Sequence, residues 1–124
     1  MLLNEWKEEA ERATLHELLY REPNIEKRNN IFIKISNLMP GLLLEMHNDL
    51  KANPFRREFV LLNKRSLYWA SGNEFIYYFE DHPELEGKVR ILMNYNLVED
   101  ITSKNVSRYV ISEDLVDFLA SFGN

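Results

Sequence analysis

The chain has 124 residues, of which 45% are hydrophobic and 28% charged, and it carries a formal net charge of −5. This length suits one domain with its own core, and the hydrophobic content excludes the composition of a disordered chain. The absence of cysteine excludes disulfides, thiolate nucleophiles and cysteine-based zinc sites.

Signals that would direct the chain to a membrane or out of the cell are missing from the sequence. No window approaches the roughly 18 consecutive apolar residues that a spanning helix needs. The segment from Met1 to Glu9 lacks the basic and apolar regions of a signal peptide. We therefore expect a cytoplasmic protein without a membrane partner.

Charge is distributed unevenly along the chain. Residues 1–26 hold three basic and seven acidic side chains, residues 27–65 hold eight and three, and residues 66–124 hold four and ten. Either these blocks attract one another in the folded chain, or the basic middle forms a surface for an anionic partner. We favour the first interpretation.

The first part of the chain has the periodicity of helices. A first helix is predicted over residues 4–21, and Pro23 ends it. A second is predicted over residues 25–38, although Ile31 to Ile35 alternates well enough to form a strand. A third is predicted from Pro40 to the stop at Asn53-Pro54, with an apolar stripe formed by Leu42, Leu43, Met46 and Leu50.

Strands are predicted to follow Asn53-Pro54. Arg57–Leu62 has apolar side chains on both faces, which indicates an interior strand, and residues 63–66 form a turn. Leu67–Ala70 and Glu74–Phe79 are predicted to form a hairpin around Ser71-Gly72-Asn73. In this loop we expect Gly72 to adopt a positive φ.

The last forty residues show a regular succession of element signals. Asp81 to Glu84, with Pro83 in the first turn, predicts the start of a helix whose buried stripe contains Leu85, Val89, Leu92 and Met93. Asn96 ends this helix. A second hairpin, Leu97–Ile101 with Ser107–Ile111, and a terminal helix capped by Ser112 complete the chain. That helix would bury Leu115, Val116, Phe118, Leu119 and Phe122.

Together these elements predict an α+β fold with N-terminal helices and a small antiparallel sheet. We expect a single domain over residues 1–124, helical in residues 1–53 and of mixed α and β structure in residues 54–124. The two halves are expected to share one core.

Residues 83–122 resemble the second half of a winged-helix domain. The resemblance rests on the order helix, Asn96-Leu97-Val98, polar turn, Arg108-Tyr109-Val110-Ile111-Ser112, helix. It implies that the first of these helices enters the major groove of DNA and that the hairpin forms the wing. The helix that should precede the recognition helix is replaced by the predicted hairpin over residues 67–79.

Basic side chains in and near these elements are the candidate nucleic-acid contacts. They are Lys64, Arg65, Lys88, Arg90, Lys104 and Arg108. Four acids, Glu84, Glu86, Glu99 and Asp100, lie in the candidate helix and wing and would repel phosphates. DNA binding is therefore the second hypothesis.

Aromatic residues follow two of these basic residues closely. They are Tyr68, Trp69, Phe75, Tyr77, Tyr78 and Phe79, next to Lys64 and Arg65. Basic and aromatic side chains together can stack single-stranded nucleic acid, but strand propensity also favours aromatic residues. We favour a place in the core for these residues, with a partner surface as the alternative.

The sequence predicts no catalytic, metal or cofactor site. His16, His47 and His82 are far apart, the glycines form no phosphate loop, and no serine lies in a nucleophile motif. Glu45 and Asp49 beside His47 could supply carboxylates to a metal or act as acid and base, but we expect them to flank the buried stripe and pair with Arg56 or Arg57.

We therefore expect a non-enzymatic interaction module that binds a protein partner or itself, with a winged-helix DNA-binding regulator as the alternative. Leu3, Trp6, Ala10 and Ala13 follow a helical spacing on an acidic segment. This segment either packs on the core of its own chain or contacts a second subunit of a homodimer.

Overall fold

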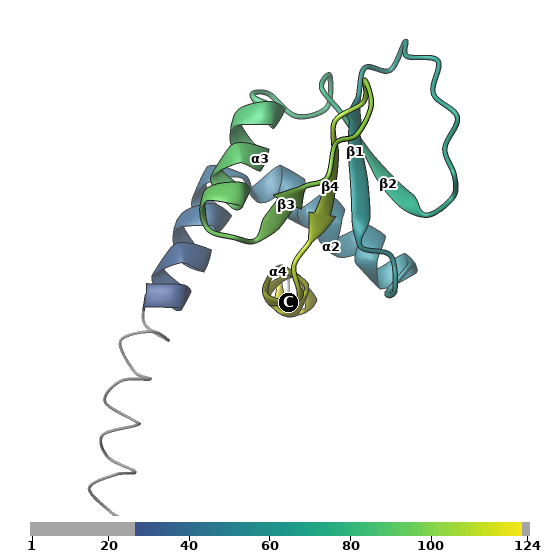
Figure 1. Cartoon of the computed structure of the whole chain (residues 1–124). Coiled ribbons are helices and arrows are strands. Elements are labelled where there is room, and N and C mark those ends of the chain that lie inside the picture. The colour runs from purple at the N-terminus through teal and green to yellow at the C-terminus, as the bar shows by residue number, and fades with distance from the viewer. Residues whose placement is uncertain (1–26, 123–124) are drawn as a thin grey trace, which may run out of the picture. The chain divides into compact units, whose positions relative to one another are not determined.

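The computed structural model describes residues 27–122 (Figure 1). The chain divides into two compact units, residues 1–34 and residues 35–124. Of the first unit, residues 27–34 are described and are helical. The second unit has an α+β fold, as predicted. The predicted helix over residues 4–21 lies outside the described residues.

Two helical segments precede the sheet, as the periodicity predicts. Residues 27–38 are helical, which decides against the strand alternative for Ile31 to Ile35. Helix α2 (Pro40–Ala52) begins with the predicted proline and ends before Asn53. Its predicted stripe is buried over its whole length, whereas Leu38, expected on the buried side of the preceding helix, is 47% exposed.

The sheet contains β1 (Glu58–Leu62), β2 (Glu74–Tyr78), β3 (Val98–Asp100) and β4 (Arg108–Ile111) in the order β2-β1-β4-β3. Strand β1 lies inside the sheet and is buried on both faces, as predicted. The β1–β4 and β3–β4 pairs are antiparallel, but β1 and β2 run parallel. The prediction of an antiparallel sheet is therefore wrong, and the sheet is mixed.

The parallel pair also overturns the first predicted hairpin. Residues 67–70 form no strand, and residues 63–73 form a loop that we call the crossover loop. Parallel neighbours require such a crossover because a tight turn joins only antiparallel strands. Pairing with β1 places Phe75 beside Phe59 and Tyr77 beside Leu61, which brings aromatic rings together in the core.

Gly72 has the predicted positive φ, at 87°, although it lies in the crossover loop and not in a hairpin. A Cβ added at Gly72 or at Gly41 of α2 would meet no atom within 4 Å, so only the backbone distinguishes the two positions. We expect Gly72→Ala to lower the free energy of unfolding by about 1 kcal/mol, and Gly41→Ala to leave it equal or raise it. Urea denaturation of both variants measures this, and equal midpoints would contradict it.

The strand register sorts the sheet side chains onto two faces. One, the aromatic face, carries Phe59, Phe75, Tyr77 and Tyr109, with the Phe59 ring centroid 5.4 Å from that of Tyr77 and 5.2 Å from that of Tyr109. The other, the charged face, carries Glu58, Glu74 and Arg108 among apolar neighbours. The two faces therefore differ in chemistry.

Helix α3 (Leu85–Asn94) begins later than predicted. Asp81 forms a turn and an ion pair with Lys64 instead of a cap, and Glu84 has a left-handed backbone with φ 59°. The first helical hydrogen bond therefore runs from the Lys88 N–H to the Glu84 carbonyl. Leu85, Val89 and Leu92 are buried as predicted, but Met93 is partly exposed.

The end of the chain follows the predicted order of elements. Asn96 has φ 59° after α3, β3 and β4 form the second hairpin, and the Ser112 Oγ accepts a hydrogen bond from Leu115 N–H at 3.2 Å. Helix α4 (Glu113–Ser121) buries Leu115 and Leu119, while Val116, Phe118 and Phe122 are only partly buried. A ring nitrogen of His47 in α2 lies 2.5 Å from the Leu119 carbonyl oxygen, so α2 and α4 are in contact.

Candidate protein-interaction surface

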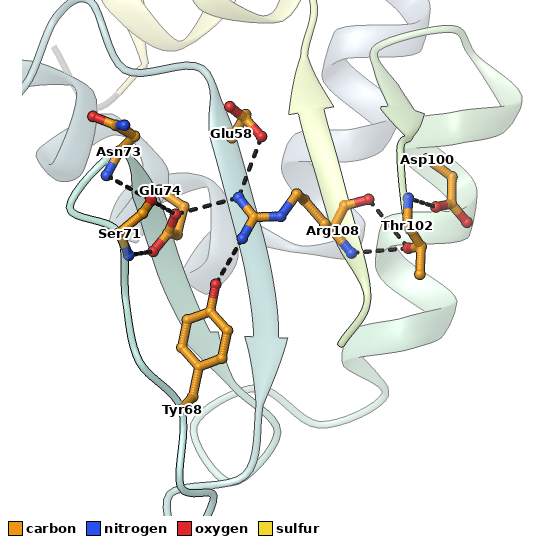
Figure 2. Close-up of polar contacts among 8 residues, drawn as sticks. All are labelled: Glu58, Tyr68, Ser71, Asn73, Glu74, Asp100, Thr102 and Arg108. Atoms are coloured by element: carbon orange, nitrogen blue, oxygen red, sulfur yellow. Dashed lines mark hydrogen bonds and ion pairs between the residues drawn. The ribbon is translucent and has the colours of Figure 1, made fainter. Parts of the chain in front are cut away.

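Arg108 connects three strands and the crossover loop on the charged face (Figure 2). Its Nη1 donates to Glu58 Oε1 and to Glu74 Oε2, each at 3.2 Å. Its Nη2 donates to the Tyr68 hydroxyl at 2.7 Å. One guanidinium on β4 thus binds side chains from β1, β2 and the loop between them.

The Glu74 carboxylate is the buried centre of this network, with no exposed side-chain surface. It accepts hydrogen bonds from the Ser71 N–H at 2.7 Å and from the Ser71 hydroxyl (Figure 2). Burial alone would raise the pKa of Glu74, but the hydrogen bonds from Ser71 and Arg108 outweigh it and hold this pKa below its ordinary value. Glu74 is therefore ionised at neutral pH and depends on Arg108 for compensation.

The crossover loop is attached at three points to side chains of the sheet and of the turn that follows β2. Near its start, Lys64 N–H donates to Glu80 at 2.9 Å and its ammonium pairs with Asp81 at 2.7 Å. In its middle, Tyr68 binds Arg108, and near its end Ser71 binds Glu74. These attachments favour a single conformation of the loop.

Two large apolar side chains on either side of Tyr68 are presented to solvent. Leu67 is 101% and Trp69 is 95% exposed, while Tyr68 between them is partly buried. This alternation is that of an extended backbone whose middle residue points inward. The inward contact of Tyr68 therefore leaves Leu67 and Trp69 directed to solvent.

An open groove of about 790 Å³ begins where the crossover loop ends. Gly72 and Asn73 of the loop line it together with Phe55, Ile101 and Val110. Phe55 is 94% exposed and Ile101 is 37% exposed. Exposed apolar side chains thus continue beyond the loop.

The six predicted nucleic-acid contacts do not act as six available cations. Lys64 and Arg108 are engaged in ion pairs with acids of the same chain. Lys104 lines a small pocket together with Tyr68 and Arg108. Arg65 is exposed in the crossover loop, and Lys88 and Arg90 lie on α3. Two of the four residues at the loop and wing therefore have their charge compensated.

The aromatic residues do not share one surface either. Phe75 and Tyr77 are buried on the aromatic face, as the core interpretation predicted, and Tyr78 and Phe79 are partly buried. Trp69 alone of the six is fully presented to solvent. The described residues therefore provide no row of exposed rings for stacking bases.

Two acids of α2, Glu45 and Asp49, lie against the 74–82 segment. Glu45 pairs with the buried His82 at 3.0 Å, and Arg57 pairs with Glu113 of α4. Burial raises the pKa of Asp49, and the positive charge of Arg56 lowers it in part. Glu45 does not pair with Arg57, because the Arg57 guanidinium binds Glu113 of α4. Within residues 27–122, no three metal-ligating side chains form a cluster.

The Tyr77 hydroxyl is the one buried side-chain polar atom of the described residues that lacks a hydrogen bond. We expect Tyr77→Phe to raise the free energy of unfolding by about 1 kcal/mol, because it removes an unsatisfied buried group. Tyr109→Phe is the control, since the Tyr109 hydroxyl interacts with Ser107. A loss of stability in Tyr77→Phe, measured by urea denaturation, would mean that this hydroxyl donates to Asp49.

No family model, curated protein or solved structure matches this chain. Across residues 27–122, every helix is too short or too polar to cross a membrane. Sequence reasoning missed the two features that define the surface, the Arg108 network and the outward position of Leu67 and Trp69. Their only sequence signal was the juxtaposition of apolar and basic residues in residues 64–69.

Proposed function

We propose that this chain is a non-enzymatic protein-interaction domain whose contact surface is the crossover loop and the adjoining groove. The observation that carries the proposal is the near-complete exposure of Leu67 and Trp69 on a loop attached to the sheet by Tyr68 and Arg108. Exposed apolar side chains that lie together are typical of protein contact sites.

The attachment of the loop is what makes its exposed side chains suitable for binding. A loop that is already ordered loses less conformational entropy on association than a mobile one. Trp is also enriched among the few residues that dominate binding energy at interfaces. The Arg108 network therefore supports binding indirectly, by positioning Trp69.

Photo-crosslinking in the cell of origin tests this proposal. We expect benzoylphenylalanine at position 67 to give a discrete protein adduct that disappears when Trp69→Ser is added. Asn48, exposed on α2, is the control position and should give none. The absence of a position-67 adduct, or an adduct that persists without Trp69, would contradict the proposal.

A winged-helix DNA-binding regulator is the second candidate, and the order α3, β3, β4, α4 favours it. The charges of this candidate DNA-binding surface, however, give little attraction for DNA phosphates. A committed duplex binder makes roughly six to ten phosphate contacts. The candidate helix and wing provide Lys88, Arg90, Lys104 and Arg108, and Arg108 is already held by two glutamates.

We predict that the chain binds a random DNA duplex no more tightly than about 100 μM near physiological salt. Fluorescence anisotropy across a salt series measures this affinity. Low-micromolar binding, with a steep salt dependence that flattens in Lys104→Ala, would make the regulator the better proposal.

A further inference from the structure

We propose that the partner of the crossover loop is a second copy of this chain, with the loop of each copy docked on the β3 edge of the other. This inference rests on the proposed function, because it names the partner of the same surface.

The loop presents a cation beside its apolar pair. Arg65 is exposed and makes no ion pair with any described residue, in contrast to its neighbour Lys64. Leu67 and Trp69 follow within four residues. A surface that complements this loop therefore needs an apolar hollow with a carboxylate at its rim.

The β3 edge of the sheet has this combination. Strand β3 is the last strand of the order β2-β1-β4-β3, so within residues 27–122 no strand pairs with its outer side. A groove of about 410 Å³ runs along it and is lined by Met93, Val98 and Val110 together with Glu99 and Asp100. Its volume lies within the range of clefts that accept compact apolar groups.

The rim of this groove carries a carboxylate that is available to a partner. Glu99 is exposed and has no ion pair among the described residues. The hydroxyl and the backbone N–H of Thr102 lower the pKa of Asp100 and keep it ionised, and the N–H donates to the carboxylate at 2.8 Å. Acids that disfavour DNA at this edge thus favour the basic loop of another copy.

A two-fold arrangement suits the positions of the two surfaces. Val110 lines both the β3 groove and the larger groove that begins at Gly72 and Asn73, so the acceptor groove adjoins the groove at the end of the crossover loop. In a two-fold dimer each contact occurs twice. This doubling matters because stable interfaces bury about 800 Å² on each partner, more than one loop tip supplies.

Charge reversal in the full chain tests the inference. We expect sedimentation equilibrium to show a dimer below about 100 μM. Arg65→Glu and Glu99→Arg should each weaken dimerisation about tenfold or more, and the double variant should restore it. Lys51→Glu, a reversal on the exposed side of α2, is the matched control and should leave the dimer intact. Thermal unfolding of each variant verifies that the fold is retained.

The possible outcomes separate this inference from the proposed function. A monomer at about 100 μM, with a position-67 adduct to another protein, overturns the inference and leaves the proposed function standing. A dimer whose affinity is unchanged in both Arg65→Glu and Glu99→Arg overturns the inference too. If Trp6→Ser then abolishes that dimer, the contact is assigned to the N-terminal segment. The absence of both dimer and adduct overturns both proposals. Rescue by the double variant supports both.

Discussion

Arg108→Met should lower the free energy of unfolding by about 3 kcal/mol at neutral pH, because it leaves the Glu74 carboxylate buried without a cation. Methionine keeps much of the apolar length of arginine and removes only its charge and hydrogen-bond donors. We take the lower end of the usual range because the Arg108 side chain is 28% exposed. Urea denaturation monitored by circular dichroism measures the loss.

Variants of the two glutamates provide the controls for Arg108. Glu58→Gln should cost far less, since the Glu58 side chain is 39% exposed. Adding Glu74→Gln to Arg108→Met should recover part of the loss, because the uncompensated charge is then gone. An Arg108→Met variant as stable as the wild type, or a Glu58→Gln variant equally damaged, would contradict the central place of Glu74.

Acid should reduce the effect of Arg108→Met. The folded-state pKa of Glu74 lies below its ordinary value, so its stabilising contribution is complete above the unfolded pKa and is lost as pH falls through the folded one. Protonated Glu74 no longer needs a cation. The difference in stability between the variant and the wild type should therefore narrow at low pH.

The elements that local chemistry defines could be predicted from the sequence. Pro40 starts α2 and Asn53 ends it, and the Ser112 side chain caps α4, since each acts on a backbone a few residues away. The β3–β4 hairpin likewise follows from two short strands joined by a polar turn. The sequence predicts too early a start for α3 because Asp81, a suitable cap, is paired with Lys64 instead.

The pairing of β2 could not be predicted in this way. Alternating residues identify Glu74–Tyr78 as a strand, but they do not identify its neighbour. The parallel partner β1 is chosen by the aromatic contacts of Phe59 and Tyr77, which lie 18 positions apart in the sequence. No local turn signal marks such a crossover.

The candidate surface could not be predicted for the same reason. The sequence shows that residue 108 is a cationic arginine, but only the fold shows that Glu58 and Glu74 lie beside it. Leu67 and Trp69 have strand propensity, which predicted a hairpin instead of an exposed loop. The self-association expected from the sequence remains a proposal, now with a surface assigned to it.

The other large effect concerns the aromatic face, where Phe59→Ala should lower the free energy of unfolding by about 3–5 kcal/mol. Phe59 is fully buried in the interior strand, and its ring packs on those of Tyr77 and Tyr109. Alanine would leave a cavity between these rings that rigid sheet neighbours cannot close. Urea denaturation measures the loss of stability. If the variant loses its fixed side-chain packing, its near-ultraviolet circular dichroism signal disappears.

Phe55→Ala is the matched control for Phe59→Ala, since it removes the same ring four residues earlier. Phe55 is 94% exposed and lies between α2 and β1, so its loss should change stability by no more than about 0.5 kcal/mol. If the two variants are equally unstable, the ring of Phe55 belongs to the core. If both are as stable as the wild type, the aromatic face does not hold the sheet together. A large loss for Phe59 alone assigns stability to the aromatic face and leaves Phe55 available to a partner.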